Sequence, residues 1–256
     1  MRNFIAIPLL SLSMLCAGQT DSLMSISIEE ALLRALRQNP SAMHQEGKKI
    51  LIRDVEATYY RMVYLNQKMN TLRSHLTLIG DLRRVAALRY ETGDIDLLEK
   101  ITLTARFDAV DLEFSMLSDE MSISRNKLKM YLFTDENLHP ADTICTLYKI
   151  KKTKPHPPGQ TTTDEADYDA FTKNLNIENL RYALNASFKK LTHFETYALE
   201  ASAVMLETAK IKLQKEEIDY CAFTELVDKA FALKTTYLDT LDAYNQTAIQ
   251  LEFHAY

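Results

Sequence analysis

The sequence predicts an all-α fold built from two long antiparallel helical hairpins, and three observations lead to this prediction. The chain of 256 residues has only 5 glycines and 6 prolines to interrupt helices. Apolar residues recur at alternating steps of three and four over long segments, as they do in coiled coils. One pattern also occurs twice with an offset of 123 positions, so that Ile95-Asp96 aligns with Ile218-Asp219.

The first residues, MRNFIAIPLLSLSMLCAGQT, are typical of an export signal. Arg2 provides the positive start, Phe4 to Leu15 the apolar stretch, and Cys16-Ala17-Gly18 a small-residue cleavage site. The apolar stretch is shorter than the ~20 residues that a membrane-spanning helix needs. We therefore expect a signal peptide over residues 1–18, with a buried N-terminal helix or a lipid on Cys16 as the alternatives.

Residues 19–132 are expected to contain a short N-terminal helix and the first hairpin. The stretch SISIEEALLRALRQNP predicts an amphipathic helix that a capping box of Ser27 and Glu30 begins and that Asn39-Pro40 ends. A heptad pattern then continues to Tyr90, and Gly93 ends that helix. The ascending helix carries its seam at Val55, Thr58, Met62, Leu65, Met69, Leu72, Leu76, Ile79, Ala86 and Tyr90, and the descending helix at Leu103, Phe107, Val110, Phe114, Leu117, Met121, Ser124, Leu128 and Tyr131.

Residues 171–256 are expected to form the second hairpin. Its ascending helix is predicted to carry the seam at Ile177, Leu180, Leu184, Ser187, Leu191, Phe194, Ala198, Ala201, Met205 and Thr208, and its descending helix runs on from Leu226. Residues 133–170 are Pro-rich and polar in their second half and are interpreted as a linker, in which Thr143 to Ile150 can hold one short strand. Because one hairpin buries only a seam, the two hairpins must pack together or against other copies.

Several function classes are not expected. With 30 basic and 35 acidic residues, the chain has no basic face for nucleic acid. No nucleophile motif, glycine-rich phosphate loop or acid–base cluster predicts an enzyme. The six histidines are scattered, so neither a metal site nor another cofactor is expected. A disulfide between Cys145 and Cys221 is not expected either, because the two residues belong at opposite ends of the hairpins.

Three segments resemble the TolC family of outer membrane efflux proteins. SISIEEALLRALRQNP resembles the family's N-terminal helix, RYETGDIDLLEKITLTARF its hairpin tip, and YLDTLDAYNQTAIQLEF its closing helix, with Tyr-Asn followed by Leu-Glu. Duplication is also a trait of this family. The second hairpin most resembles the heavy-metal branch, the CzcC and CusC type.

The resemblance implies a trimer whose hairpins form a periplasmic tube, and whose tips meet a membrane-fusion adaptor linked to an inner-membrane RND pump. By matching positions, the docking tips are Gly93, Asp94, Ile95 and Asp96, and Glu216, Glu217, Ile218 and Asp219. The second tip has Glu216 where the first has Gly93, which leaves the geometry of its turn open. The acidic tip residues can equally be helix-capping residues in solvent.

The chain departs from the family in one respect. Each repeat of the family contributes two membrane-spanning strands to an outer-membrane β-barrel, whereas here the segment before each hairpin is too short for such strands and lacks their alternation of apolar and polar residues. We therefore expect a TolC-like helical fold without the barrel, exported to the periplasm or to the periplasmic side of the cell outer membrane. The expected role is a passive one in heavy-metal RND tripartite efflux, as a homotrimer or with a complete TolC-like channel. The alternatives are a soluble periplasmic coiled-coil scaffold and a degenerate copy that does not transport.

Overall fold

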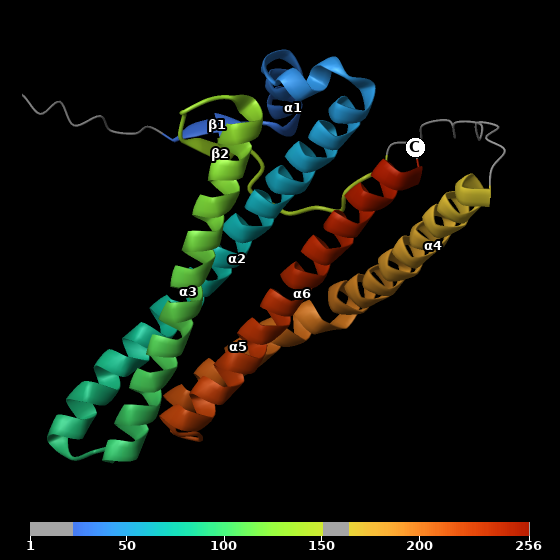
Figure 1. The fold of residues 1–256 in the computed structure, drawn as a ribbon. Coiled ribbons are helices and arrows are strands. Elements are labelled where there is room, and N and C mark those ends of the chain that lie inside the picture. Colours follow the sequence, from blue (N-terminus) through green and yellow to red (C-terminus); the bar gives the residue numbers. More distant parts are fainter. Residues whose placement is uncertain (1–22, 151–163, 256) are drawn as a thin grey trace, which may run out of the picture.

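The computed structural model describes residues 23–150 and 164–255. The expected signal peptide with Cys16, and most of the Pro-rich segment, lie outside these residues. The described part consists mainly of long helices that run side by side, with both hairpin tips at the same end (Figure 1). This confirms the predicted all-α arrangement of two antiparallel hairpins. None of the described helices combines the length and the apolar character needed to cross a membrane.

The N-terminal helix has the predicted start and end. Helix α1 (Ile28–Gln38) begins at Ser27, whose hydroxyl accepts a hydrogen bond from the Glu30 amide at 3.2 Å. It ends at Asn39, whose side chain donates to the Tyr131 carbonyl oxygen at 3.2 Å and accepts from the Ser41 amide in the following 3₁₀ turn η1 (Pro40–Met43). The Asn-Pro pair therefore both stops α1 and fastens it to the end of the first hairpin.

The first hairpin consists of α2 (Gln45–Thr92) and α3 (Leu97–Leu132). With 48 residues, α2 is about 72 Å long at 1.5 Å per residue. The predicted seam is confirmed over most of both helices, and its buried members include Val55, Met62, Leu65, Leu72, Ile79, Ala86, Leu103, Val110, Leu117, Met121 and Leu128. It is wrong at Tyr90, which is exposed, because the seam ends near the tip with Leu82 and Ala86.

The second hairpin consists of α4 (Asp164–His193), a π-helical turn η2 (Phe194–Ala198), α5 (Leu199–Gln214) and α6 (Tyr220–Ala255). The predicted seam holds as far as Leu191 and Ala198, which are buried. Beyond the π-turn the prediction is wrong by one residue: Ser202 and Ala209 are fully buried, whereas the predicted Ala201 and Thr208 are exposed.

The π-turn accounts for this shift. A π-turn accommodates one extra residue within a helix, so every residue after it is displaced by one position relative to a continuous heptad. A strict count of sevens from Leu180 therefore reaches Ala201 and Thr208 instead of their successors. The inserted residue displaces the exposed face of the helix by the same amount.

A deletion experiment tests whether the π-turn is an inserted residue. Removing Thr196, which lies within the turn, should give a continuous α-helix that keeps both faces in register, and should lower the melting temperature by only a few degrees. Removing Ala203 from the middle of α5 should instead rotate Ala209 out of the core and unfold much of the hairpin. Thermal denaturation followed by circular dichroism compares the two deletions, and equal losses would contradict the interpretation.

The expected strand at Thr143 to Ile150 is absent; the segment is an irregular strap that crosses α2 and α6. Its backbone bonds side chains instead of a neighbouring strand: the Cys145 amide donates to Gln67 Oε1 and the Tyr148 amide to Asn245 Oδ1, both at 2.7 Å. The two short strands that do form are β1 (Met24–Ile26) and β2 (Leu138–Pro140), which pair in parallel just before the strap.

A series of polar contacts joins the two hairpins where α2, α3 and α6 meet. The residues on α2 are spaced one heptad apart and are Arg61, Lys68 and His75. Arg61 binds Glu120 on α3 and Asp242 on α6, and Lys68 contacts Glu113 and Asp239 on the same two helices. At the third level, Asp228 on α6 accepts hydrogen bonds from both His75 and Arg106 of α3. This junction fixes how the first hairpin packs on the second.

Candidate functional site: the hairpin tips

The first tip is a short turn between α2 and α3 that begins with Gly93. Gly93 has a positive φ of 80°, the left-handed conformation that commonly follows a helix end. The Asp94 amide then donates to the Arg89 carbonyl oxygen at 2.8 Å. Asp96 caps the start of α3, because its carboxylate accepts from the Glu99 amide at 2.8 Å.

The second tip repeats this geometry residue by residue. Glu216 adopts a positive φ of 57° at the position of Gly93, so the turn is kept even though the glycine is not. The Glu217 amide donates to the Lys212 carbonyl oxygen at 2.9 Å, and Asp219 accepts from the Ala222 amide at 2.7 Å. Each of these bonds is the counterpart of a first-tip bond at the offset of 123.

The two tips share one apolar cluster. Ile95 and Ile218 are both half-buried and pack against it. The cluster draws its buried members from both hairpins and includes Leu82, Ala86, Leu103, Ala209, Phe223, Val227 and Phe231. The structure therefore brings the two predicted isoleucines together, and it gives them a role in joining the tips.

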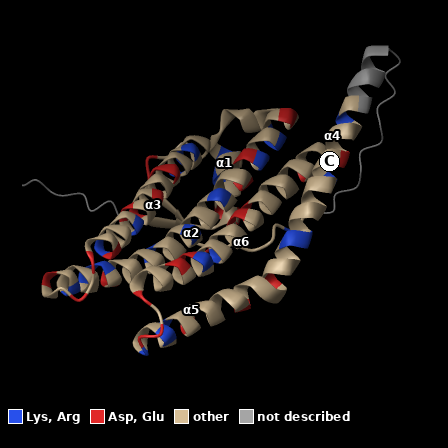
Figure 2. Ribbon diagram, turned by 90° about the horizontal axis from the view of Figure 1, so that it is seen from below, with Lys and Arg blue, Asp and Glu red and all other residues tan. Residues whose placement is uncertain are grey.

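The predicted acidic residues fall into two groups. Asp96 and Asp219 are used as helix caps, whereas Asp94, Glu216 and Glu217 are exposed on the turns. Figure 2 shows acidic residues in the turns at both tips. An exposed group of this kind can attract a basic surface.

Cys221, at the second tip, lies close to carboxylates of both hairpins. Its pKa is raised by burial and then by the nearby carboxylates of Glu99, Asp219 and Asp96, which belong to both hairpins. The thiol is therefore kept protonated at neutral pH. Within the described ranges, no group of three or more His, Cys, Asp or Glu side chains is placed to hold a metal ion.

The sequence did not identify the residues that tie one tip to the other. Glu99 accepts a hydrogen bond from the Tyr220 amide at 3.1 Å, and the Arg89 guanidinium lies 5.5 Å from the centre of the Tyr220 ring. Both contacts link the first hairpin with the start of α6. Glu99 and Tyr220 are not repeated at the offset of 123, so the duplicated pattern does not predict these contacts.

Comparisons with known proteins find similarity in structure only. No protein-family model matches the sequence, and no curated protein matches it either. Among solved structures, CusC, described in terms of conformational changes accompanying folding and transmembrane channel formation, is similar with a TM-score of 0.65 and 12% identity, over 89% of this chain and 95% of that chain.

Two further structures give the same result. The CmeC outer membrane channel of Campylobacter jejuni has a TM-score of 0.66 and 10% identity, over 89% of this chain and 68% of that chain. A membrane protein from Pseudomonas aeruginosa has a TM-score of 0.64 and 11% identity, over 90% of this chain and 72% of that chain. At these identities the comparison establishes the fold: the chain has the helical fold of outer membrane channel proteins.

Proposed function

We propose that this protein is a component of a TolC-type efflux duct, in which it forms part of a helical conduit and docks a membrane-fusion adaptor through its two tips. Its role is passive, and it carries out no chemical step. The observation that supports this proposal most strongly is the structural likeness to outer membrane channels over nearly the whole described chain. Localisation to the outer membrane or the periplasm follows from the same proposal.

The tips are the adaptor site in this proposal. They are the points where the hairpins end, and they present Asp94, Glu216 and Glu217 to solvent on a turn geometry that both repeats maintain. A rigid pair of turns with exposed carboxylates suits a partner that has basic residues at its own end. The inner-membrane pump to which the adaptor is linked is proposed to be of the RND type. The sequence of the second hairpin favours the heavy-metal branch of these systems.

Charge reversal at equivalent positions tests the docking site. Asp94→Lys combined with Glu217→Lys should lower the amount of adaptor recovered with the tagged protein from cross-linked host membranes at least tenfold, because both turns then repel a basic partner. Neither side chain belongs to the apolar cluster that joins the tips, so the fold should be kept. Recovery is measured by quantitative mass spectrometry.

A matched control reverses two exposed acidic residues away from the tips, Glu46→Lys and Asp135→Lys. This variant should recover as much adaptor as the unmodified protein. If the tip variant also recovers the adaptor in full while circular dichroism shows an unchanged fold, docking through the tips is wrong.

A further inference from the structure

The end of the first hairpin opposite to its tip forms a corner in which several chain segments meet. Helix α1 ends there, η1 turns the chain, α2 begins, and α3 ends beside them (Figure 1). The hydrogen bond from the Asn39 side chain to the Tyr131 carbonyl oxygen places η1 next to the last turn of α3. We call this part of the molecule the corner and define it as residues 37–50 and 127–136.

The turn at the corner is held firmly against the start of α2. Gly47 lies so close to η1 that a Cβ at this position would be 2.3 Å from the Ser41 carbonyl oxygen. A residue with a side chain would therefore force the turn to move. The Ser41 amide also donates to the Asn39 side chain at 3.0 Å. Residues between Ser41 and Gly47 are thus presented in a fixed position relative to both helices.

Two large apolar side chains lie at the surface of the corner. Met43, the last residue of η1, is 84% exposed, and Phe133, the first residue after α3, is 62% exposed. Ile50, in the second turn of α2, is also exposed. Exposed apolar side chains that gather at one place and have polar residues around them mark a site of contact with another protein or a membrane.

Phe133 occupies a position that is unfavourable for an aromatic residue. Its φ of 50° lies in the left-handed region, and the equivalent place at the end of α2 is taken by Gly93. The side chain is mostly exposed, so packing inside the protein does not explain why a bulky residue is present there. Such an outlier points to a contact made outside the folded chain.

The corner is basic, although the whole chain has a net charge of -5. Its two stretches contain three acidic residues and five basic ones, which are Arg37, Lys48, Lys49, Lys127 and Lys129. One of the acidic residues, Glu136, is bound by Arg34 of α1. The stretches around the tips, residues 89–100 and 212–223, have seven acidic residues and four basic ones. The two ends of the first hairpin therefore differ in the sign of their charge.

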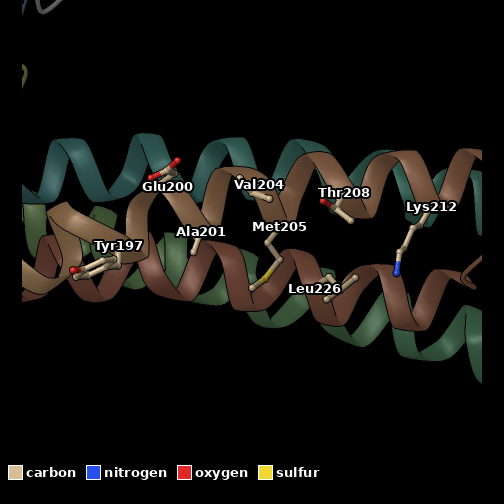
Figure 3. Close-up of a pocket in the computed structure, with 8 residues that line it drawn as sticks. All are labelled: Tyr197, Glu200, Ala201, Val204, Met205, Thr208, Lys212 and Leu226. Atoms are coloured by element: carbon tan, nitrogen blue, oxygen red, sulfur yellow. The ribbon is translucent and has the colours of Figure 1, made fainter.

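The form of the corner distinguishes it from a surface that binds a helix. A groove of the latter kind lies between α5 and α6; it has a volume of about 560 Å³, a mainly apolar lining, and Met205 and Leu226 at its two sides (Figure 3). A groove suits the side chains of another helix. The corner is instead an end of the molecule, on which separate apolar side chains stand among basic ones. That combination is typical of proteins that bind at the surface of an anionic membrane.

We infer that the corner binds the surface of a bilayer that contains anionic phospholipids. Met43 and Phe133 enter the boundary between the headgroups and the acyl chains, and the exposed Arg37 and Lys48 bind phosphate groups beside them. This inference goes beyond the proposed function, which requires no contact between these residues and lipid.

Sedimentation with lipid vesicles tests the inference. The protein is prepared from Gln19 onward, so that neither the expected signal peptide nor a lipid on Cys16 takes part. It should bind to vesicles of equal parts phosphatidylglycerol and phosphatidylcholine, much more weakly to vesicles of phosphatidylcholine alone, and less as the salt concentration rises. Equal binding to both kinds of vesicle would overturn the inference. Binding to neither would overturn it as well and would leave the corner to a protein partner.

Removal of basic side chains tests the location of the contact. Arg37→Gln combined with Lys48→Gln should lower the partition coefficient for the mixed vesicles about thirtyfold, because each basic residue near an anionic surface contributes a factor of about five. Lys210→Gln combined with Lys215→Gln removes two exposed basic residues near the second tip and should leave binding unchanged. Equal losses from the two pairs would contradict the assignment to the corner.

Phe133→Gly separates the lipid contact from the stability of the fold. Glycine suits the positive φ, so the melting temperature should be unchanged or higher, whereas binding to the mixed vesicles should fall about tenfold because the aromatic ring is lost. Met116→Ser, at an exposed position in the middle of α3, is the control and should bind as the unmodified protein does. A folded Phe133→Gly protein with full vesicle binding would overturn the inference.

The vesicle assay contains neither adaptor nor pump, so its result is independent of the proposed function. Vesicle binding together with full adaptor recovery by the tip variant would remove tip docking and keep this inference. Loss of adaptor from the tip variant, without vesicle binding by the unmodified protein, would do the reverse.

Discussion

Replacing Arg61 with glutamine is expected to lower the free energy of unfolding by about 3 kcal/mol, a large part of the stability of a typical domain. Arg61 links Glu120 on α3 with Asp242 on α6, and the Asp242 side chain is only 8% exposed. The variant leaves that carboxylate buried at the junction of the hairpins without its cation. Urea denaturation followed by circular dichroism measures the loss.

The same variant should show a distinct pH dependence. Burial raises the pKa of Asp242, and Arg61 opposes that rise. Without Arg61 the folded-state pKa rises further, so the folded protein binds the proton more tightly than the unfolded chain. Stability should therefore be lowest near neutral pH and recover as the pH falls through the folded-state pKa. Arg84→Gln, which removes an exposed pair with Asp81, should cost less than 0.5 kcal/mol, about the limit for surface changes. A variant Arg61→Gln that unfolds like Arg84→Gln at every pH would contradict the assignment.

Replacing Asn245 with leucine is expected to destabilise the fold by about 3 kcal/mol and to release the strap from the helices. The Asn245 side chain is 1% exposed. Its oxygen accepts from the buried Tyr148 amide at 2.7 Å, and its nitrogen donates to the Thr146 carbonyl oxygen at 2.9 Å. Leucine can do neither, so the Tyr148 amide would lose its partner and the strap its attachment.

Hydrogen exchange measured by mass spectrometry checks this result locally. Peptides that cover residues 141–150 should lose protection in Asn245→Leu, whereas those from the tips should not. Asn126→Leu, at an exposed position on α3, is the matched control and should change neither stability nor exchange. Unchanged protection of the strap in Asn245→Leu would contradict the role assigned to the side chain.

The internal repeat in the sequence predicts that the two tips have the same backbone geometry, and the structure has matching hydrogen bonds in both. The offset of 123 that aligns Ile95 with Ile218 also aligns the backbone bonds of Asp94 with those of Glu217, and it holds for the two aspartate caps. Repetition is informative here because each turn is set by local hydrogen bonds. The two tips differ at the residue with a positive φ. This residue is Gly93 in the first tip, whereas in the second tip Glu216 adopts the conformation that glycine adopts more easily.

The π-turn was missed because a seam counted from one end of a helix carries no sign of an inserted residue. The repeat did hold that sign. Counting from the tips, the buried His75, Ile79 and Ala86 of α2 correspond at the same offset to Ala198, Ser202 and Ala209, all of which are buried. Counting positions in α5 backwards from the repeated tip, instead of forwards from Ile177, therefore identifies the face that is buried.

The strap and the short strands were beyond sequence reasoning for a different reason. Residues 143–150 form no strand because their backbone partners are the side chains of Gln67 and Asn245, far away in the chain. The strands that form have 3 residues each, which is too short for any periodicity to appear.

The attachment of the strap also has a consequence for folding during synthesis. The strap is held by Gln67, which precedes it in the chain, and by Asn245, which follows Tyr148 by 97 residues. A growing chain completes the first hairpin well before α6 has emerged from the ribosome, so the strap is fastened on the α2 side alone until synthesis is nearly finished.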